Sequence, residues 1–333
     1  MKDTHFNKRV SLLHKKKGKL MHSKILILGA CGQIGTELTM ALRAEYGADQ
    51  VVASDIRPGD ESLMSSGPFE ILDATDYNAL EDVVLHYEIE TVYLMAAMLS
   101  ATSEKFPMKA WSLNMNTLFH VLNLAKDRKI SRIFWPSSIA VFGPHTPKEN
   151  TPQQCIMEPS TVYGMSKLAG EGWCQYYQKQ YGVDVRSLRY PGLISWKTLP
   201  GGGTTDYAVD IFHKALEKGV FESFLAKDSM LPMMYMDDAI RATIEIMQHE
   251  STALKKGMAY NLSAMSFTPA TLTQSIQKQL PDFSISYSPD FRQAIADSWP
   301  NSISDTMART DWNWSPAFNL DRMVLEMLTQ LKK

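Results

Sequence analysis

KILILGACGQIG, at residues 24–35, is the stretch that decides the fold. Its apolar run from Ile25 to Leu28 has the length and composition of a buried strand, and glycines follow at positions 29, 32 and 35. Residues 33–46 then show the apolar spacing of a helix. Glycine lets a backbone approach closely, and the free N–H groups at the start of a helix attract phosphate. This succession is typical of a dinucleotide-binding site.

Strand-like and helix-like segments alternate from this stretch to residue 190, which predicts a parallel sheet covered by helices on both faces. The expected fold class is α/β, a doubly wound parallel sheet (Rossmann fold) with a smaller C-terminal α/β substrate lobe. Thr75 is the expected cap of one helix. Strands are expected at residues 24–28, 50–54, 69–72, 91–97, 132–137 and 184–189, and helices at 33–46, 76–86, 111–129 and 161–181.

The pattern changes after Tyr190, where residues 200–205 form a glycine- and threonine-rich loop. Helices are expected at 206–218, 269–279 and 320–331, and short strands near Tyr260 and Ile285. The expected domains are a disordered extension at 1–20, an NAD-binding Rossmann domain at 21–190, and a mainly substrate-binding lobe at 191–333, some segments of which return to the first domain. The natural start is expected at Met21, since the run at 15–19, Lys-Lys-Lys-Gly-Lys, can be encoded by an A/G-rich tract of the kind that serves as a ribosome-binding site shortly before a start codon.

The composition excludes several classes of protein. A net charge of −2 implies no basic surface for nucleic acid. The apolar run at 92–99 is far shorter than the roughly 20 residues of a membrane helix. Three cysteines without a C-x-x-C pair fit a reduced, cytoplasmic protein without structural zinc, and no metal site is expected.

Acidic residues end two of the expected strands. Asp55 lies twenty residues beyond Gly35, where a carboxylate binds the ribose hydroxyls of NAD and repels the 2′-phosphate of NADP. Arg57 lies close by and is a possible phosphate ligand, but the aspartate favours NAD. Asp73 either reaches the adenine amino group or serves a helix start.

Tyr163 and Lys167 are spaced to share one face of a helix. A phenol is a poor base at neutral pH, because its pKa is about 10. A neighbouring ammonium is expected to lower that pKa so that the tyrosine accepts a proton. Ser138 precedes the tyrosine and can donate a hydrogen bond to a substrate oxygen, although Ser137 and Ser138 taken alone indicate a turn. Base, hydroxyl donor and nucleotide cradle together suggest hydride transfer to a nicotinamide cofactor.

After Met21 the chain resembles the extended short-chain dehydrogenase/reductase family. The motifs that carry the resemblance are Gly29-x-x-Gly32-x-x-Gly35, Asp55, Asp73, Ala96-Ala97, Asn114, residues 138–143, Tyr163-x-x-x-Lys167, residues 189–192 and residues 308–316. The resemblance implies catalysis by Tyr163, Lys167 and Ser138. It implies NAD contacts from Gly29, Gly32, Gln33, Ile34, Gly35, Asp55, Ile56, Arg57, Asp73, Ala96, Ala97, Tyr163, Lys167 and Tyr190.

Within that family, residues 30–38, 138–144, 201–207 and 297–300 resemble the short-chain type of L-threonine 3-dehydrogenase. This implies metal-independent, NAD-dependent oxidation of L-threonine at its 3-hydroxyl to 2-amino-3-ketobutyrate. It places around the substrate Leu99, Ser100, Ser138, Tyr163, Gly203, Thr205 and Trp299. Simpler interpretations exist for two of them, since Trp299 fits an ordinary core and Thr205 fits a cap for the helix at 206–218.

The alternative is an NDP-sugar epimerase or dehydratase of the same family. Such members usually carry an asparagine two residues after the tyrosine of R-Y-F-N, and this chain has Gly192 there. A non-enzymatic dinucleotide sensor ranks last, because the chain keeps both Tyr163 and Lys167. Family resemblance also implies a homodimer built from the helices at 111–129 and 161–181.

Overall fold

The computed structural model describes residues 24–197, 203–250 and 252–333. The expected extension at 1–20 and the first part of the glycine-rich loop lie outside these residues. The chain divides into two compact units, Met1–Ala96 with His120–Ile133, and Ala97–Phe119 with Phe134–Lys333. They are called the first and second unit below. The expected domain boundary at residue 190 stays a prediction.

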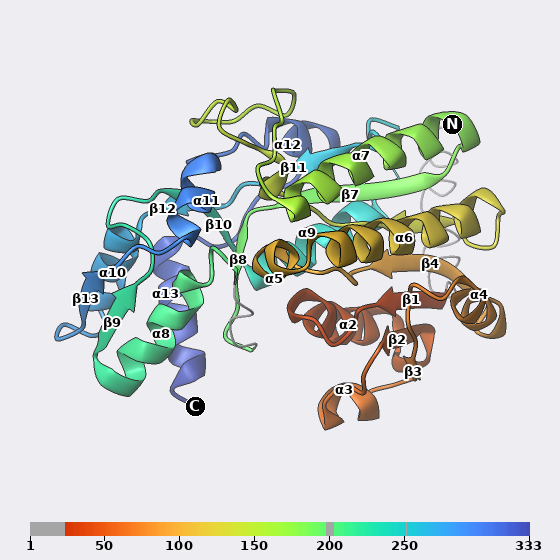
Figure 1. Ribbon diagram of the computed structural model, residues 1–333. Coiled ribbons are helices and arrows are strands. Elements are labelled where there is room, and N and C mark those ends of the chain that lie inside the picture. Colours follow the sequence, from red (N-terminus) through yellow and green to blue (C-terminus); the bar gives the residue numbers. More distant parts are fainter. Residues whose placement is uncertain (1–23, 198–202, 251) are drawn as a thin grey trace, which may run out of the picture. The chain divides into compact units, whose positions relative to one another are not determined.

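The first unit is built on a parallel sheet in the order β3-β2-β1-β4 (Figure 1). Its strands are β1 (Lys24–Leu28), β2 (Val51–Asp55), β3 (Phe69–Ile71) and β4 (Ile89–Leu94), and its helices include α2 (Gln33–Tyr46), α3 (Glu61–Ser65) and α4 (Tyr77–His86), with a 3-10 turn at Ala48–Gln50. Leu26, Ile27 and Val92 are fully buried. Such continuous apolar strands are typical of a parallel sheet that is covered on both faces.

Two elements of the first unit depart from expectation. Asp76, not Thr75, caps α4, because its carboxylate accepts a hydrogen bond from the backbone N–H of Ala79 at 3.1 Å. The strand expected at 91–97 already begins at Ile89 and ends at Leu94. It stops there because the next two N–H groups, of Met95 and Ala96, both turn to the Leu28 carbonyl oxygen.

The second unit contributes the parallel strands β7 (Asp184–Tyr190), β11 (Ala259–Asn261) and β6 (Ser137–Ser138). β5 (Arg132–Phe134) spans the boundary between the units. A single strand was expected at 132–137. Pro136 has no N–H to donate, and the strand divides at this position into β5 and β6.

The residues at the ends of two long helices account for where these helices begin and end. α6 (Pro107–Lys126) begins four residues before the expected position, with Pro107 at its first residue, and Arg128 beyond its end has a left-handed φ of 60°. α7 (Val162–Tyr181) is capped by the Thr161 hydroxyl, which accepts from the Gly164 N–H at 3.0 Å. Gly182, at φ 72°, ends it.

The second unit has an apolar core around α8, α10 and α13, which pack beside the β9–β13 pair in Figure 1. The core includes the fully buried Phe212, Met233 and Met323. The remaining elements of the second unit are α5 (Ser100–Lys105), a 3-10 turn at Ile139–Val141, β8 (Gly192–Ile194), α8 (Tyr207–Lys218), β9 (Val220–Ser223), β10 (Leu231–Tyr235), α9 (Met236–Gln248), β12 (Met265–Phe267), α10 (Pro269–Gln277), β13 (Ser284–Tyr287), α11 (Arg292–Ser298), α12 (Thr306–Trp312) and α13 (Leu320–Leu331).

The expected fold class is confirmed, because the structure is a mixed α/β fold with a large parallel sheet flanked by helices. The expected strand near Tyr260 pairs in parallel with β7, whereas the strand near Ile285 belongs to the separate β9–β13 pair.

Candidate active site

The glycine-rich turn of the first unit has the geometry of a phosphate cradle. Gly29 has a positive φ of 87°, and a Cβ there would lie 2.5 Å from the Ala96 nitrogen. A Cβ at Gly35 would overlap the Gly29 carbonyl oxygen and lie 2.9 Å from the Ala30 Cα. Only glycine fits these positions, and the space it leaves is where a pyrophosphate approaches the backbone.

The start of α2 completes the cradle. Gly32 is its N-cap residue, and among the described side chains none caps this helix end. Gln33 and Ile34 follow, both half-exposed. The first N–H groups of α2 are therefore left for a ligand, and the positive end of the helix dipole favours an anion there. The residues present fit a dinucleotide.

Asp55 ends β2 and is fixed against the turn, because its carboxylate accepts a hydrogen bond from the Cys31 N–H at 3.0 Å. Ile56 and Arg57 follow on the exposed surface. Asp73 is partly committed, since one of its oxygens accepts from both the N–H and the hydroxyl of Thr75, at 2.8 and 2.7 Å. These bonds hold the pKa of Asp73 below its usual range. Its role at the adenine stays a prediction.

In the second unit the structure brings Ser138, Tyr163 and Lys167 together. The Ser138 hydroxyl lies close enough to the Tyr163 phenol to lower its pKa, and it accepts a hydrogen bond from the Ala140 N–H at 3.2 Å. The Lys167 Nζ lies 5.5 Å from the centre of the Tyr163 ring. The Lys167 ammonium donates to the Pro136 carbonyl oxygen at 2.6 Å and lies 4.7 Å from the centre of the Trp135 ring. Lys167 is only 3% exposed.

The protonation of this group differs from expectation. We expected Lys167 to lower the pKa of Tyr163, but burial raises that pKa to about 12, and only the hydrogen bond from Ser138 acts to lower it. Burial also lowers the pKa of Lys167 to about 7, against the attraction of Cys174 and Glu171. The physical reason is shared, because enclosure disfavours the charged form of each side chain.

Glu171, which sequence reasoning missed, is hydrogen-bonded to Ser137, the residue before Ser138. Its carboxylate accepts from the Ser137 hydroxyl at 2.5 Å and pairs with Arg189 through two bonds of 2.9 and 2.7 Å. Arg189 also donates to Asn261 at 3.0 Å. Glu171 and Arg189 are 2% and 3% exposed. The sequence signal for Glu171 was its position four residues after Lys167, which places both residues on the same face of α7.

Asn114 connects the start of α5 with α7 inside the second unit. Its side-chain amide donates to the Ser166 hydroxyl at 3.2 Å, and its oxygen accepts from the Met98 N–H at 2.8 Å. Leu99 and Ser100 are the next two residues after Met98. Leu99 is 53% exposed, whereas Ser100 is buried.

The other predicted substrate residues lie in separate surroundings. The Gly203 N–H donates to Asp206 at 2.6 Å. Thr205 packs against Gly192, and α8 begins at Tyr207, so the expected cap by Thr205 at residue 206 is wrong. Trp299 is 6% exposed and belongs to the apolar core. The substrate roles of these residues stay predictions.

Tyr190 and Ala97 complete the predicted cofactor residues. The Tyr190 hydroxyl is hydrogen-bonded to Thr243 in the interior, and Ala97 follows β4 with a half-exposed side chain. Their contacts with NAD stay predictions.

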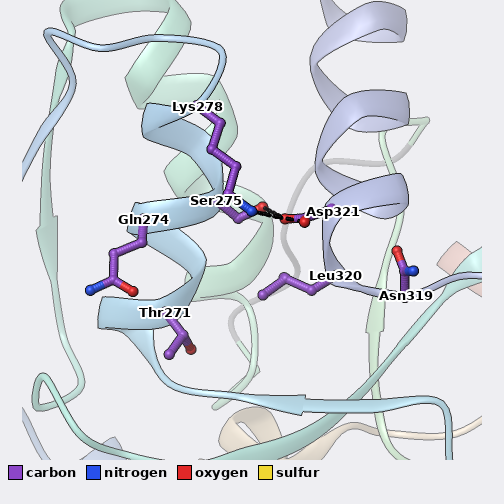
Figure 2. A pocket seen from close by; sticks show the side chains of 7 residues that line it. All are labelled: Thr271, Gln274, Ser275, Lys278, Asn319, Leu320 and Asp321. Carbon is purple, nitrogen blue, oxygen red and sulfur yellow. Dashed lines mark hydrogen bonds and ion pairs between the residues drawn. The ribbon is translucent and has the colours of Figure 1, made fainter.

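Two pockets lie within single units. One of about 260 Å³ in the first unit is lined by Cys31, Thr36, Arg57, Pro58, Gly59, Asp60 and Leu63. The other, of about 380 Å³, lies between α10 and α13 in the second unit (Figure 2). Its charged side chains, Lys278 and Asp321, pair with each other at 2.8 Å, and Ser275 donates to the same carboxylate. It contains none of the predicted site residues.

Within the described ranges, no group of three or more histidine, cysteine or acidic side chains could hold a metal ion. Among the helices of the same ranges, none combines the length and the apolar character needed to cross a membrane.

Comparisons with known proteins match nearly the whole chain. The model of the NAD dependent epimerase/dehydratase family matches residues 25–263. An uncharacterized epimerase/dehydratase of Staphylococcus saprophyticus is 50% identical over 311 residues, which are 93% of this chain and 97% of the relative.

Solved structures agree in fold. An L-threonine dehydrogenase from Cupriavidus necator, in its holo form, is 55% identical with a TM-score of 0.90, covering 92% of this chain and 99% of that one. An L-threonine dehydrogenase from Clostridium difficile is 45% identical with a TM-score of 0.91, covering 93% and 98%. The cradle and the family match together assign NAD as the cofactor. The chain therefore belongs to the NAD dependent epimerase/dehydratase family, the extended short-chain dehydrogenases.

Proposed function

We propose that the protein oxidises L-threonine at its 3-hydroxyl to 2-amino-3-ketobutyrate, with reduction of NAD to NADH. The observation that carries the proposal is the Ser138–Tyr163–Lys167 group in a chain that is 55% identical to an L-threonine dehydrogenase over 92% of its length. The family supplies the cofactor, and the residues below supply the proton chemistry.

Tyr163, Ser138 and Lys167 have different tasks in the proposed reaction. Tyr163 takes the proton of the substrate hydroxyl, and Ser138 donates a hydrogen bond to the same oxygen. NAD, when bound, supplies the acceptor for the hydride that leaves C3 of threonine, together with a positive charge. That charge is needed, because the enclosed Tyr163 has a pKa of about 12 without it. Lys167, with a pKa of about 7, is suited to pass the proton onward.

The cradle would hold the cofactor through its backbone. The N–H groups at the start of α2 would bind the pyrophosphate, and the Asp55 carboxylate would bind the adenosine ribose. Lys167 is proposed to donate a hydrogen bond to the nicotinamide ribose.

The position of Gly192 favours this proposal over an NDP-sugar epimerase or dehydratase. A Cβ at Gly192 would lie 2.7 Å from Thr205 Cγ2 and would overlap the Met233 sulfur. The asparagine that nucleotide-sugar members usually carry here to hold the diphosphate would therefore require both of these side chains to move.

A substrate panel tests the proposal. The purified protein is mixed with NAD and threonine, serine, 3-hydroxybutyrate or UDP-galactose, and NADH is followed by its absorbance. We expect NADH with threonine and little with the other three. Conversion of the UDP-sugar to an isomer without net NADH, and no NADH with threonine, would overturn the proposal in favour of an epimerase.

We propose further that the protein is a homodimer that forms through α6 and α7. Both helices expose large apolar side chains: Trp111 is 39% exposed, Trp173 40%, Tyr176 46% and Met165 47%. The Phe119 and Trp173 rings meet edge to face at 5.0 Å, which joins the two helices into one apolar surface.

Light scattering on a sizing column tests the dimer. We expect a mass of two chains for the wild type and of one chain for Trp173→Glu, with an unchanged far-ultraviolet circular dichroism spectrum. A wild-type monomer would overturn the proposed dimer.

A cytoplasmic location is also proposed, because Cys31, Cys155 and Cys174 are free thiols. Cell fractionation tests this location.

A further inference from the structure

The pocket of the first unit lies beside the residue that binds the adenosine ribose. Cys31 lines the pocket, and its N–H donates to Asp55 at 3.0 Å. Arg57, two residues after Asp55, lines the same pocket with its exposed side chain. Since Asp55 is the residue suited to the ribose hydroxyls, the pocket is the space into which a 2′-phosphate would extend.

Arg57 alone would make this pocket attractive to a phosphate. Guanidinium groups bind phosphate through paired donors. Among the described residues, no ion pair joins Arg57 to a carboxylate. The backbone oxygen of Arg57 accepts a weak hydrogen bond from the Cys31 thiol at 3.6 Å. The structure thus places Arg57, a cation suited to binding phosphate, in a protein whose family uses NAD, which has no 2′-phosphate.

Asp60 places an opposing charge in the same pocket. Its carboxylate caps α3, accepting from the Leu63 N–H and from the Ser62 hydroxyl, both at 2.8 Å. These bonds hold the pKa of Asp60 below its usual range, so that the group is charged at neutral pH. Cys31, Arg57 and Asp60 all line this pocket, and the Cys31 N–H holds the Asp55 carboxylate beside it.

We propose that Asp60 is a second determinant of cofactor choice, and that its carboxylate offsets Arg57 in the pocket beside Asp55 and excludes the 2′-phosphate of NADP. One positive charge then faces two negative charges, and a phosphate bearing about two further negative charges is repelled. NAD has no 2′-phosphate to enter the pocket, and it therefore does not contact Asp60. The inference rests on the dinucleotide site and is independent of the substrate.

The test measures cofactor binding, not turnover. Asp60→Asn removes the charge and keeps the α3 cap, because asparagine caps helices as well as aspartate does. Calorimetry at low salt is expected to show NADP binding about tenfold tighter in the variant and NAD binding unchanged. The gain is expected to shrink at high salt, and to be absent in Asp60→Asn combined with Arg57→Met.

Asp76→Asn is the matched control, because Asp76 is the N-cap of α4 in the same unit and does not line the pocket. Thermal unfolding verifies that both variants are folded, and Asp60→Ser is a second cap-preserving variant. The simpler probes 2′-AMP and 5′-AMP isolate the phosphate position: only 2′-AMP should gain. Equal effects of Asp60→Asn and Asp76→Asn on NADP, or a gain that survives Arg57→Met, would overturn the proposal.

Discussion

Two polar clusters serve the proposed chemistry, and they hold charge in opposite surroundings. In the second unit, Lys167 is 3% exposed and burial shifts the pKa values of Lys167 and Tyr163 toward their neutral forms. In the first unit, Arg57 and Asp60 line an open pocket, and donors from the backbone and a hydroxyl keep Asp60 charged. The enclosed cluster changes protonation, whereas the open one keeps its charges and acts by attraction and repulsion.

The largest expected effect is the loss of the enclosed base. Tyr163→Phe keeps the ring and removes the proton acceptor, so turnover should fall by about 10³-fold or more, while NAD binding stays nearly intact. Turnover is measured by the absorbance of NADH, and NAD binding is measured by calorimetry. Turnover like that of the wild type would remove Tyr163 from the role of base.

The next largest effect is expected from the buried ion pair of Glu171 with Arg189, which lies beside Ser137. Glu171→Leu leaves Arg189 buried without its carboxylate, which is expected to lower the free energy of unfolding by about 3–5 kcal/mol. The control is Lys278→Met, which breaks an ion pair with both partners exposed and should hardly move the melting temperature. Equal melting temperatures for the two variants would contradict the importance of enclosure.

A smaller effect is expected from pH. The folded pKa of Lys167 is about 7, below its ordinary value, so between pH 7 and pH 10 the unfolded chain binds a proton that the folded chain has released. The free energy of unfolding should therefore rise with pH in this window, by about 2 kcal/mol from pH 7 to pH 9 relative to Lys167→Met. Denaturant titrations at each pH measure it. Parallel curves for the two proteins would mean that Lys167 stays charged.

The smallest expected effect concerns the open cluster. Asp55→Ala removes the ribose acceptor and the partner of the Cys31 N–H, so NAD should bind about tenfold more weakly. The preference for NAD over NADP should narrow as well, because one repelling charge is gone. Binding of both cofactors measures this, and an unchanged ratio would leave cofactor choice to other residues.

How far the sequence predicts each region follows from the range of its contacts. The cradle was predictable because its constraints are local: Gly29 and Gly35 are required by backbone atoms nearby, and α2 spans Gln33–Tyr46 as expected. The cap of α4 was missed by one residue, since Thr75 and Asp76 are both good caps and only the bond to Ala79 decides between them.

The second unit was less predictable. Glu171 acquires its role from Arg189 and Asn261, which lie on other elements, and a single sequence shows no such pairing. The direction of the pKa shift of Tyr163 depends on enclosure by the whole surroundings, which residue spacing does not give. Trp299 was expected either in the pocket or in the core, and it packs in the core.

The contact of Gly192 with Thr205 and Met233 constrains how this chain can evolve. A larger residue at position 192 requires the side chains of Thr205 and Met233 to move or to be replaced by smaller ones, and a smaller residue at either position alone would leave a void. The effect of a substitution at position 192 is thereby coupled to the residues at 205 and 233, so these three positions have to be changed together.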